Sequence, residues 1–218
     1  MTRPLNLDTL KLSFGSHDED EDEGEMCVME AVAYIAGEPW SDHPHCVSPV
    51  IAAFCRAWND TQDPYGAEIR DRLRHYIPRL IGTRGDAAQE ERRSWLALDW
   101  LIRVQTATWL RVAGLTEHAE TLINLPPQTS PEALHAGTAA RAAAGDAAWA
   151  AAGDAAGDAT WAAAGAAAGD AARAAAGDAA RAATWAAARD AARAALKTTV
   201  EELQTSAWQL LDAMLAVE

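Results

Sequence analysis

The chain has 218 residues, a formal net charge of −14 and three cysteines. This length suffices for one ordinary domain with an additional segment. The acidic balance argues against a nucleic-acid-binding protein, which usually carries a basic stripe. No run of about 18 apolar residues marks a membrane span. We therefore expect a chain that binds neither nucleic acid nor membrane.

Charge is distributed unevenly along the chain. Residues 1–65 carry 3 basic and 13 acidic side chains, a net charge of −10, whereas residues 66–111 carry 9 and 6, a net charge of +3. The basic excess includes five arginines: Arg70, Arg72, Arg74, Arg79 and Arg84. We interpret them as a solvated helix face that offsets the acidic N-terminal segment.

The cysteines, Cys27, Cys46 and Cys55, are an odd number. The first residues, MTRPLNLDTLKLSF, lack the apolar core of a secretory signal. Together these features predict a cytoplasmic protein whose cysteines are thiols or metal ligands rather than disulfides.

Residues 1–25 contain a dense acidic run, with seven carboxylates between Asp18 and Glu25. Like charges at this density repel one another and bury nothing. We therefore predict a disordered acidic leader over residues 1–25.

Residues 26–127 carry the pattern of a bundle of about five helices. The first helix ends at Gly37, and the second starts with Ser48 as its N-cap and Pro49 in the first helical position. The inner stripe of the second helix consists of Ile51, Phe54, Cys55 and Trp58.

Three more helices complete the predicted bundle. Residues 67–77 form a helix that Pro78 kinks or ends. Residues 87–113 form a long helix that ends at Gly114, and Thr116 caps a short helix that reaches Leu125. The inward stripe of the long helix consists of Trp95, Leu98, Leu101, Gln105 or Ala107, and Trp109.

The segment LPPQTSP is the clearest boundary, because paired prolines cannot continue a helix. A new helix begins with Ser130 and Pro131. No segment alternates in the manner of a strand. The predicted fold class is therefore all-α: a helical bundle followed, over residues 130–218, by a long alanine-rich helix or a helical hairpin.

Residues 141–196 consist of fourteen tetrapeptides of the form [G/W/R]-[A/D]-A-[A/T]. Because an α-helix turns about 100° per residue, each first position lies about 40° beyond the previous one. This drift is too fast for a conventional coiled coil. The tetrapeptide repeat contains three tryptophans, Trp149, Trp161 and Trp185. We predict that they are anchors, either packed internally or forming a partner-binding stripe.

The segment GDAAGD combines C-cap and N-cap residues, so we expect any break in the repeat helix near residues 152–159. After the repeat, residues 196–217 form an apolar heptad seam. The seam consists of Leu196, Val200, Leu203, Ala207, Leu210, Met214 and Val217. Few charges flank it, so we expect burial in a bundle, within one chain or between protomers.

The segment CVMEAVAYIAGEPWSDHPHC gathers most of the metal-ligating residue types. Thiolate and imidazole are the ligands that zinc prefers, four at a time. Cys27, His43 and Cys46, with Glu30 or His45 as the fourth ligand, would form such a site. The spacing matches no standard zinc finger. The alternative is two core cysteines and loop histidines, which needs no cofactor.

A thiol enzyme is a third interpretation, with Cys27 as the nucleophile paired with His43. A helix N-terminus lowers a thiol pKa, whereas the upstream carboxylates oppose thiolate formation. No phosphate-binding glycine loop, H-E-x-x-H or G-x-S-x-G motif is present.

Three blocks, MCVMEAVAYIAGEPWSDHPHC, VIAAFCRAWND and LDWLIRVQTATWLRVAGLTEHA, resemble an uncharacterised all-helical family of actinobacterial and actinophage proteins. The resemblance covers roughly residues 25–125. It implies a bacterial or phage protein in the cytoplasm, and it implies no activity.

The sequence thus favours a non-enzymatic α-helical protein that binds a protein partner or a second copy of itself. The bundle would be the scaffold and the Ala/Trp-rich helix the arm. A zinc-binding protein and a thiol enzyme are the two alternatives.

Overall fold

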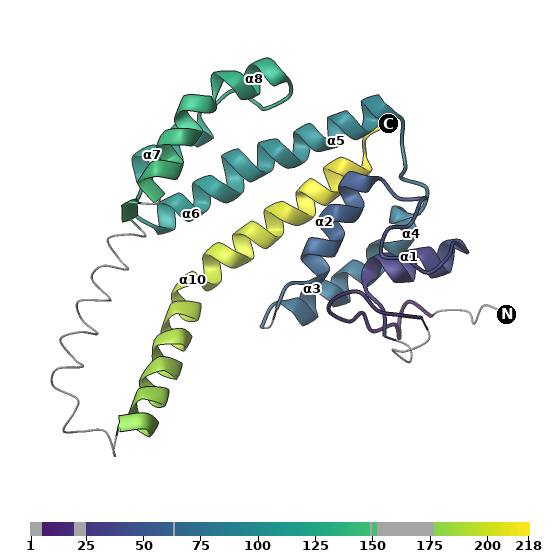
Figure 1. Cartoon of the computed structure of the whole chain (residues 1–218), viewed down its shortest axis with the longest axis horizontal. Helices are drawn as coiled ribbons and strands as arrows, with labels where there is room; N and C mark the ends of the chain where they lie inside the picture. Colours follow the sequence, from purple (N-terminus) through teal and green to yellow (C-terminus); the bar gives the residue numbers. More distant parts are fainter. Residues whose placement is uncertain (1–5, 20–24, 63, 149, 152–176) are drawn as a thin grey trace. The chain divides into compact units, whose positions relative to one another are not determined.

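The computed structural model describes residues 6–19, 25–62, 64–148, 150–151 and 177–218, and in the last helix it describes side chains from residue 194 onward. These residues form helices and loops and contain no strand, so the all-α fold class is confirmed. Figure 1 shows the helices in chain order.

The chain divides into two compact units. Unit 1 consists of Met1–Ala97 and Leu210–Glu218, and unit 2 consists of Leu98–Gln209. Both divisions lie inside helices rather than in linkers. The predicted boundary at residues 127–130 lies within unit 2, where the paired prolines separate two helices of the same unit.

Unit 1 is built from short helices and the first part of a long one. They are α1 (Val28–Ala36), α2 (Pro49–Asn59), α3 (Gly66–Leu73), the 3-10 turn η1 (Arg74–Tyr76), α4 (Ile77–Leu80) and α5 (Ala87–Trp100). Helix α1 ends at Gly37, whose φ of 72° is left-handed, as predicted. Helix α2 starts as predicted, with the Ser48 side chain accepting from the N–H of Ile51.

The inner face of α2 follows the predicted stripe. Ile51 and Cys55 are fully buried, and Phe54 and Trp58 are partly buried. The rings of Phe54 and Trp58 pack edge to face, with centroids 5.1 Å apart.

The prediction that Pro78 kinks or ends the preceding helix is refined by the structure. The chain tightens into η1 and then resumes as α4, with Pro78 in its first turn. A proline is tolerated there because its missing N–H has no helical partner to lose. Ile69, Leu73 and Ile77 are buried on one side of this segment.

The long helix predicted over residues 87–113 contains an interruption. A π-helical turn, η2 (Leu101–Thr106), lies between α5 and α6 (Ala107–Val112). Gly114 ends the helix as predicted, with a φ of 78°.

This π turn makes part of the predicted inward stripe wrong. A π turn takes one more residue than an α turn and rotates the helix faces that follow it. Ala107 is buried as predicted, and Ile102 and Leu110 are buried with it, whereas Leu101 and Trp109 are exposed.

Unit 2 has its own apolar core. It includes the end of α5, η2, α6, α7 (Thr116–Ile123) and α8 (Pro131–Ala136). The core consists of Ile102, Ala107, Leu110, Ala119, Leu122 and Ala144. Ser130 caps α8 as predicted. Thr116, in contrast, is the first residue of α7, and no side chain caps that helix.

The last helix, α10 (Gly177–Leu215), carries the predicted apolar seam. Ala207, Leu210 and Met214 are buried, together with their neighbours Trp208 and Leu211. Leu196, Val200, Leu203 and Val217 are less deeply buried. The predicted break near residues 152–159 lies outside the described residues.

Candidate functional site

The segment Ser13–Asp18, here called the N-terminal strap, is attached to the ends of α1 and α2. The N–H of Ser13 donates to Met26 O over 2.9 Å, and Asn59 Nδ2 donates to Ser13 O over 2.8 Å. The N–H of Gly15 donates to Asp60 Oδ1 over 2.8 Å. The sequence predicted a disordered leader over residues 1–25; in the structure this part of it forms hydrogen bonds at the ends of α1 and α2.

Glu30 joins the strap to the start of α1. The residue is 1% exposed, and its carboxylate accepts from the N–H of Cys27 over 2.7 Å and from the N–H of His17 over 2.7 Å. The ring Nδ1 of His17 lies 3.0 Å from the same carboxylate. A carboxylate is stabilised at this position because the helix N-terminus presents unpaired N–H groups and a partial positive charge.

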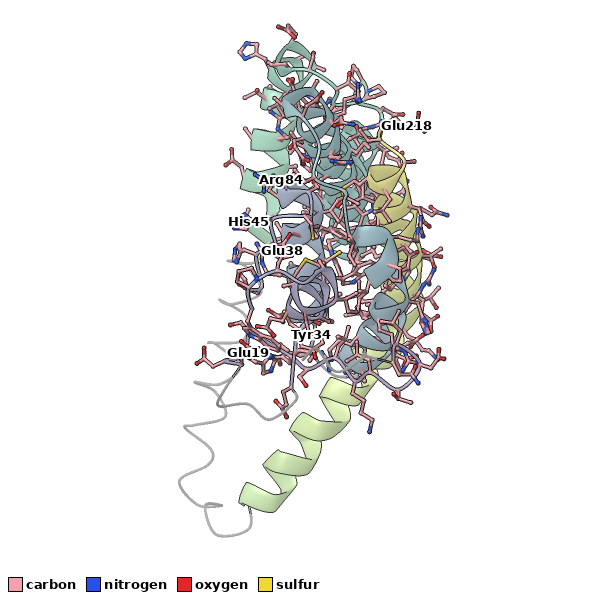
Figure 2. The ribbon with its side chains drawn as sticks, turned by 90° about the vertical axis from the view of Figure 1, so that its right-hand side faces the viewer. Glu19, Tyr34, Glu38, His45, Arg84 and Glu218 are labelled. Carbon is pink, nitrogen blue, oxygen red and sulfur yellow. The ribbon has the colours of Figure 1, made fainter. Side chains whose placement is uncertain are left out.

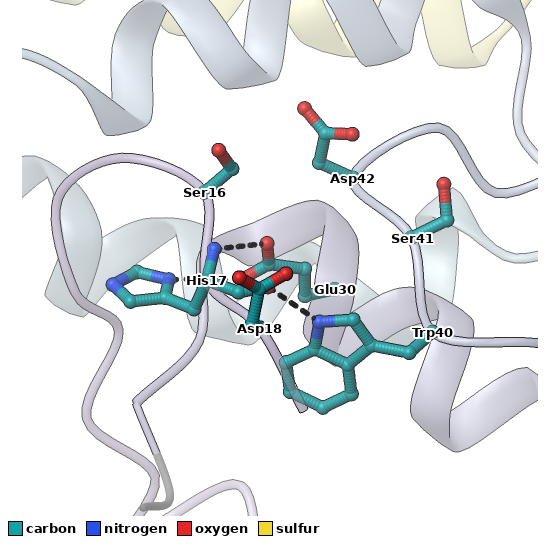
Figure 3. A pocket seen from close by; sticks show the side chains of 7 residues that line it. All are labelled: Ser16, His17, Asp18, Glu30, Trp40, Ser41 and Asp42. Carbon is teal, nitrogen blue, oxygen red and sulfur yellow. Dashed lines mark hydrogen bonds and ion pairs between the residues drawn. The ribbon is translucent and has the colours of Figure 1, made fainter. Parts of the chain in front are cut away.

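A pocket of about 360 Å³ opens between the strap and the loop after α1. It is lined by Ser16, His17, Asp18, Glu30, Trp40, Ser41 and Asp42 (Figure 3). The Trp40 indole N–H donates to the carbonyl of His17 over 2.7 Å, which fixes this side of the pocket.

Two acidic groups of this pocket are engaged in holding the structure together. Both oxygens of Glu30 accept hydrogen bonds from the strap or from α1. Asp42 lies 2.6 Å from the ring of His43 and 4.0 Å from Arg56 Nε. The arrangement is a polar joint between the strap, the start of α1 and the loop after α1.

The five predicted metal ligands do not come together as one site. Cys27 and Glu30 form the capping box of α1, in which each side chain accepts from the other residue's backbone N–H. The His43 ring contacts Asp42 instead and is 67% exposed. Across the described residues, no three His, Cys, Asp or Glu side chains are placed to hold a metal ion.

His45 and Cys46 belong to a different contact, around Glu38. Figure 2 labels His45 and Glu38. The Glu38 carboxylate accepts from the N–H of His45 and from the Cys46 thiol. Burial and the neighbouring Glu38 raise the pKa of the Cys46 thiol. The N–H of Arg84 donates to Cys46 O over 3.1 Å, so this loop is tied to the segment before α5.

The environment of Cys27 opposes a nucleophilic role. Its side chain is the N-cap of α1, and the residue is 3% exposed. Burial raises the pKa of the Cys27 thiol to about 12, and this effect outweighs the lowering expected at a helix N-terminus. Cys55 is also buried, and its pKa is likewise raised to about 12.

An exposed apolar surface lies on the π turn and α6 of unit 2. Leu101 is 46% exposed, Trp109 39% and Val112 46%. In an uninterrupted α-helix, eight residues place two side chains about 80° apart. The additional residue of the π turn brings Leu101 and Trp109 closer to one line, and Val112 follows within one turn. We call these three residues the apolar face.

The predicted tryptophan anchors cannot be compared with this surface. Trp149 and Trp161 lie outside the described residues, as does the side chain of Trp185. The sequence did not point to the apolar face, because Leu101 and Trp109 belong to the core stripe of an uninterrupted helix.

Comparison of the chain with family models, curated proteins and solved structures gave no match. None of the helices in the described ranges has an apolar stretch long enough to cross a membrane.

Proposed function

We propose that this chain is a non-enzymatic helical protein-interaction or self-association module, which binds through the apolar face. The observation that carries the proposal is the exposure of Leu101, Trp109 and Val112, which lie within about three helical turns of one another on η2 and α6. Tryptophan is among the residues most enriched at the hot spots of protein interfaces, so Trp109 is the expected anchor. Clustered apolar exposure of this kind is typical of interaction surfaces.

The chemistry of the described residues supports a binding role over catalysis. Cys27 is a buried N-cap, and the Glu30 carboxylate holds the strap. The three cysteines are free thiols, which supports the proposal of a reducing, cytoplasmic location.

Site-specific photo-cross-linking in the cells that make the protein tests this proposal. A photoreactive residue replaces Gln105, which lies on the π turn between Leu101 and Trp109, in the full-length chain. We expect a covalent adduct with a protein, and a mass of twice the chain identifies a second copy. Replacement of Gln62, an exposed glutamine between α2 and α3, is the matched control.

Three further variants sharpen the test. Leu101→Glu and Trp109→Glu should abolish the adduct, whereas Leu96→Glu, at an exposed leucine of α5, should leave it unchanged. An adduct that forms equally well from the control position, or that survives both glutamates, contradicts the proposal.

A further inference from the structure

Unit 1 is completed by a segment from the far end of the chain. Residues 210–218, here called the C-terminal segment, follow the rest of unit 1 after 112 intervening residues, from 98 to 209. Leu210 is 6% exposed, and Leu211 and Met214 are fully buried. The last turn of α10 is therefore part of the core of unit 1.

The polar contacts of this segment converge on a few side chains, here called the anchor site: Tyr76, Arg79, Arg92 and Arg93. Arg93 is 3% exposed, and its guanidinium donates to Met214 O over 3.1 Å and to Val217 O over 3.3 Å. These carbonyls lie at the end of α10, where a helix leaves acceptors unpaired. Arg92 donates to Glu218 O.

A charge pair adds specificity to the docking. Arg79 Nη1 lies 2.8 Å from Asp212 Oδ1, and the Tyr76 hydroxyl donates to the same carboxylate over 3.4 Å. The chain carries no lysine or arginine after Lys197, whereas the anchor site presents three arginines. The segment and its anchor site are therefore complementary in charge.

We propose that the anchor site also binds the C-terminal segment of a second copy of this chain, so that two chains exchange these segments. A second copy brings the same carbonyls, the same Asp212 and the same buried side chains, and exchange requires no new interface. Loop-closure entropy changes slowly with length, and the contacts within one chain already span more than a hundred residues. The fraction of chains in exchanged dimers then increases as the protein concentration rises. This proposal deepens the proposed self-association but uses a surface separate from the apolar face.

Two full-length charge-reversal variants test the exchange. Within one chain, Arg79→Glu places a second carboxylate opposite Asp212, and Asp212→Arg places a second guanidinium opposite Arg79. Both native side chains are about half exposed, at 52% and 49%, so the substitutions are compatible with folding. In an exchanged heterodimer of the two variants, each anchor site faces the tail of the other variant. One of the two contacts then pairs the new glutamate with the new arginine, and the other pairs the native Arg79 with the native Asp212.

Native mass spectrometry and sedimentation of the mixture give the readout. We expect the heterodimer to form with a dissociation constant roughly tenfold lower than that of either variant alone. The double variant R79E/D212R restores the pair within one chain and should match the unmodified protein. A mixture with no more dimer than its components, while circular dichroism shows both folded, overturns the proposal.

A second measurement covers the case in which a variant fails to fold. Arg79→Cys and Asp212→Cys are made in separate chains that also carry Cys46→Ser, and the mixture is treated with a short bismaleimide. A link between positions 79 and 212 of different chains supports exchange, and the absence of such a link in the mixture contradicts it. Leu101→Glu should leave this link intact, which separates the present proposal from the proposed function.

Discussion

His17 meets the carboxylate of Glu30 twice, through its backbone N–H at 2.7 Å and through its ring Nδ1 at 3.0 Å. The same carboxylate accepts from the N–H of Cys27. One buried side chain thus caps α1 and fastens the N-terminal strap, so the order of the strap and the start of the helix are coupled.

Replacement of Glu30 by alanine should therefore destabilise unit 1 strongly. The change removes a helix cap and leaves buried N–H groups without an acceptor, at a cost of about 2–4 kcal/mol in the free energy of unfolding. Urea unfolding gives that value, and hydrogen exchange at Gly15 and His17 should accelerate. His43→Ala, at an exposed histidine, should change stability by less than about 0.5 kcal/mol. Equal effects of the two substitutions would contradict this role of Glu30.

The cysteines should differ sharply in reactivity. Burial raises the pKa of Cys27 and of Cys55 to about 12, so at pH 8 each has roughly a thousandfold less thiolate than a thiol of pKa about 9. We expect an aromatic disulfide reagent to modify Cys46, which is partly exposed, before the other two. Cys46→Ser should remove the early phase, and rapid modification of Cys27 in the folded protein would revive the thiol-enzyme interpretation.

The same raised pKa values make stability depend on alkaline pH. A thiol whose pKa is higher in the folded than in the unfolded chain contributes stability below the unfolded value, about 8.5. That contribution is lost as the pH rises toward 12. Urea unfolding between pH 7 and pH 10.5 should show a decline that Cys55→Ala reduces, after allowance for the lost packing of the thiol.

Glu90 should make the stability of the protein fall at acidic pH, whereas the cysteines make it fall at alkaline pH. Burial by itself raises its pKa, but hydrogen bonds from Ser48 and the N–H of Gly85, with the charge of Arg93, lower it overall. Its contribution to stability is thus present above the unfolded pKa of about 4.3 and is lost as the pH falls through the lower folded value. Glu90→Gln should flatten unfolding curves between pH 3 and pH 5, and Glu68→Gln, at an exposed site, should not.

Two glycine-to-alanine substitutions should have opposite effects. A Cβ on Gly66 would lie 1.9 Å from the backbone oxygen of Thr61, so the start of α3 must shift. A Cβ on Gly145 would meet nothing within 4 Å, and the residue is helical. Thermal unfolding should show a loss of about 1–3 kcal/mol for Gly66→Ala and a gain of about 0.4–1 kcal/mol for Gly145→Ala. Two effects of the same sign would contradict this account.

Local signals in the sequence predicted the helices well where a cap or a stop decided the structure. Ser48 with Pro49, Gly37 and Gly114 act within one turn of their own positions, so the residues near them contain the information. The π turn was not predicted, because no residue type between Leu101 and Thr106 distinguishes it from an ordinary α-helix.

The candidate sites were harder to predict because they join distant parts of the chain. Nothing beside Arg93 indicates that its guanidinium meets a carbonyl 121 residues later. Glu30 was considered as a zinc ligand because Cys27 is nearby in sequence, whereas the structure uses the same pair as a capping box. The three-residue spacing of Cys27 and Glu30 fits both a capping box and a pair of metal ligands, so the spacing alone does not distinguish them.

The position of the C-terminal segment has a consequence for synthesis of the protein. A ribosome that has made Ala97 must add 112 residues before it reaches Leu210, which takes roughly 6–22 s at about 5–20 residues per second. During that interval the first 97 residues wait without Leu211 and Met214, while all of unit 2 is produced. The unit that begins first is thus the one that can finish only last, and its incomplete core is open to the tail of a neighbouring chain on the same messenger.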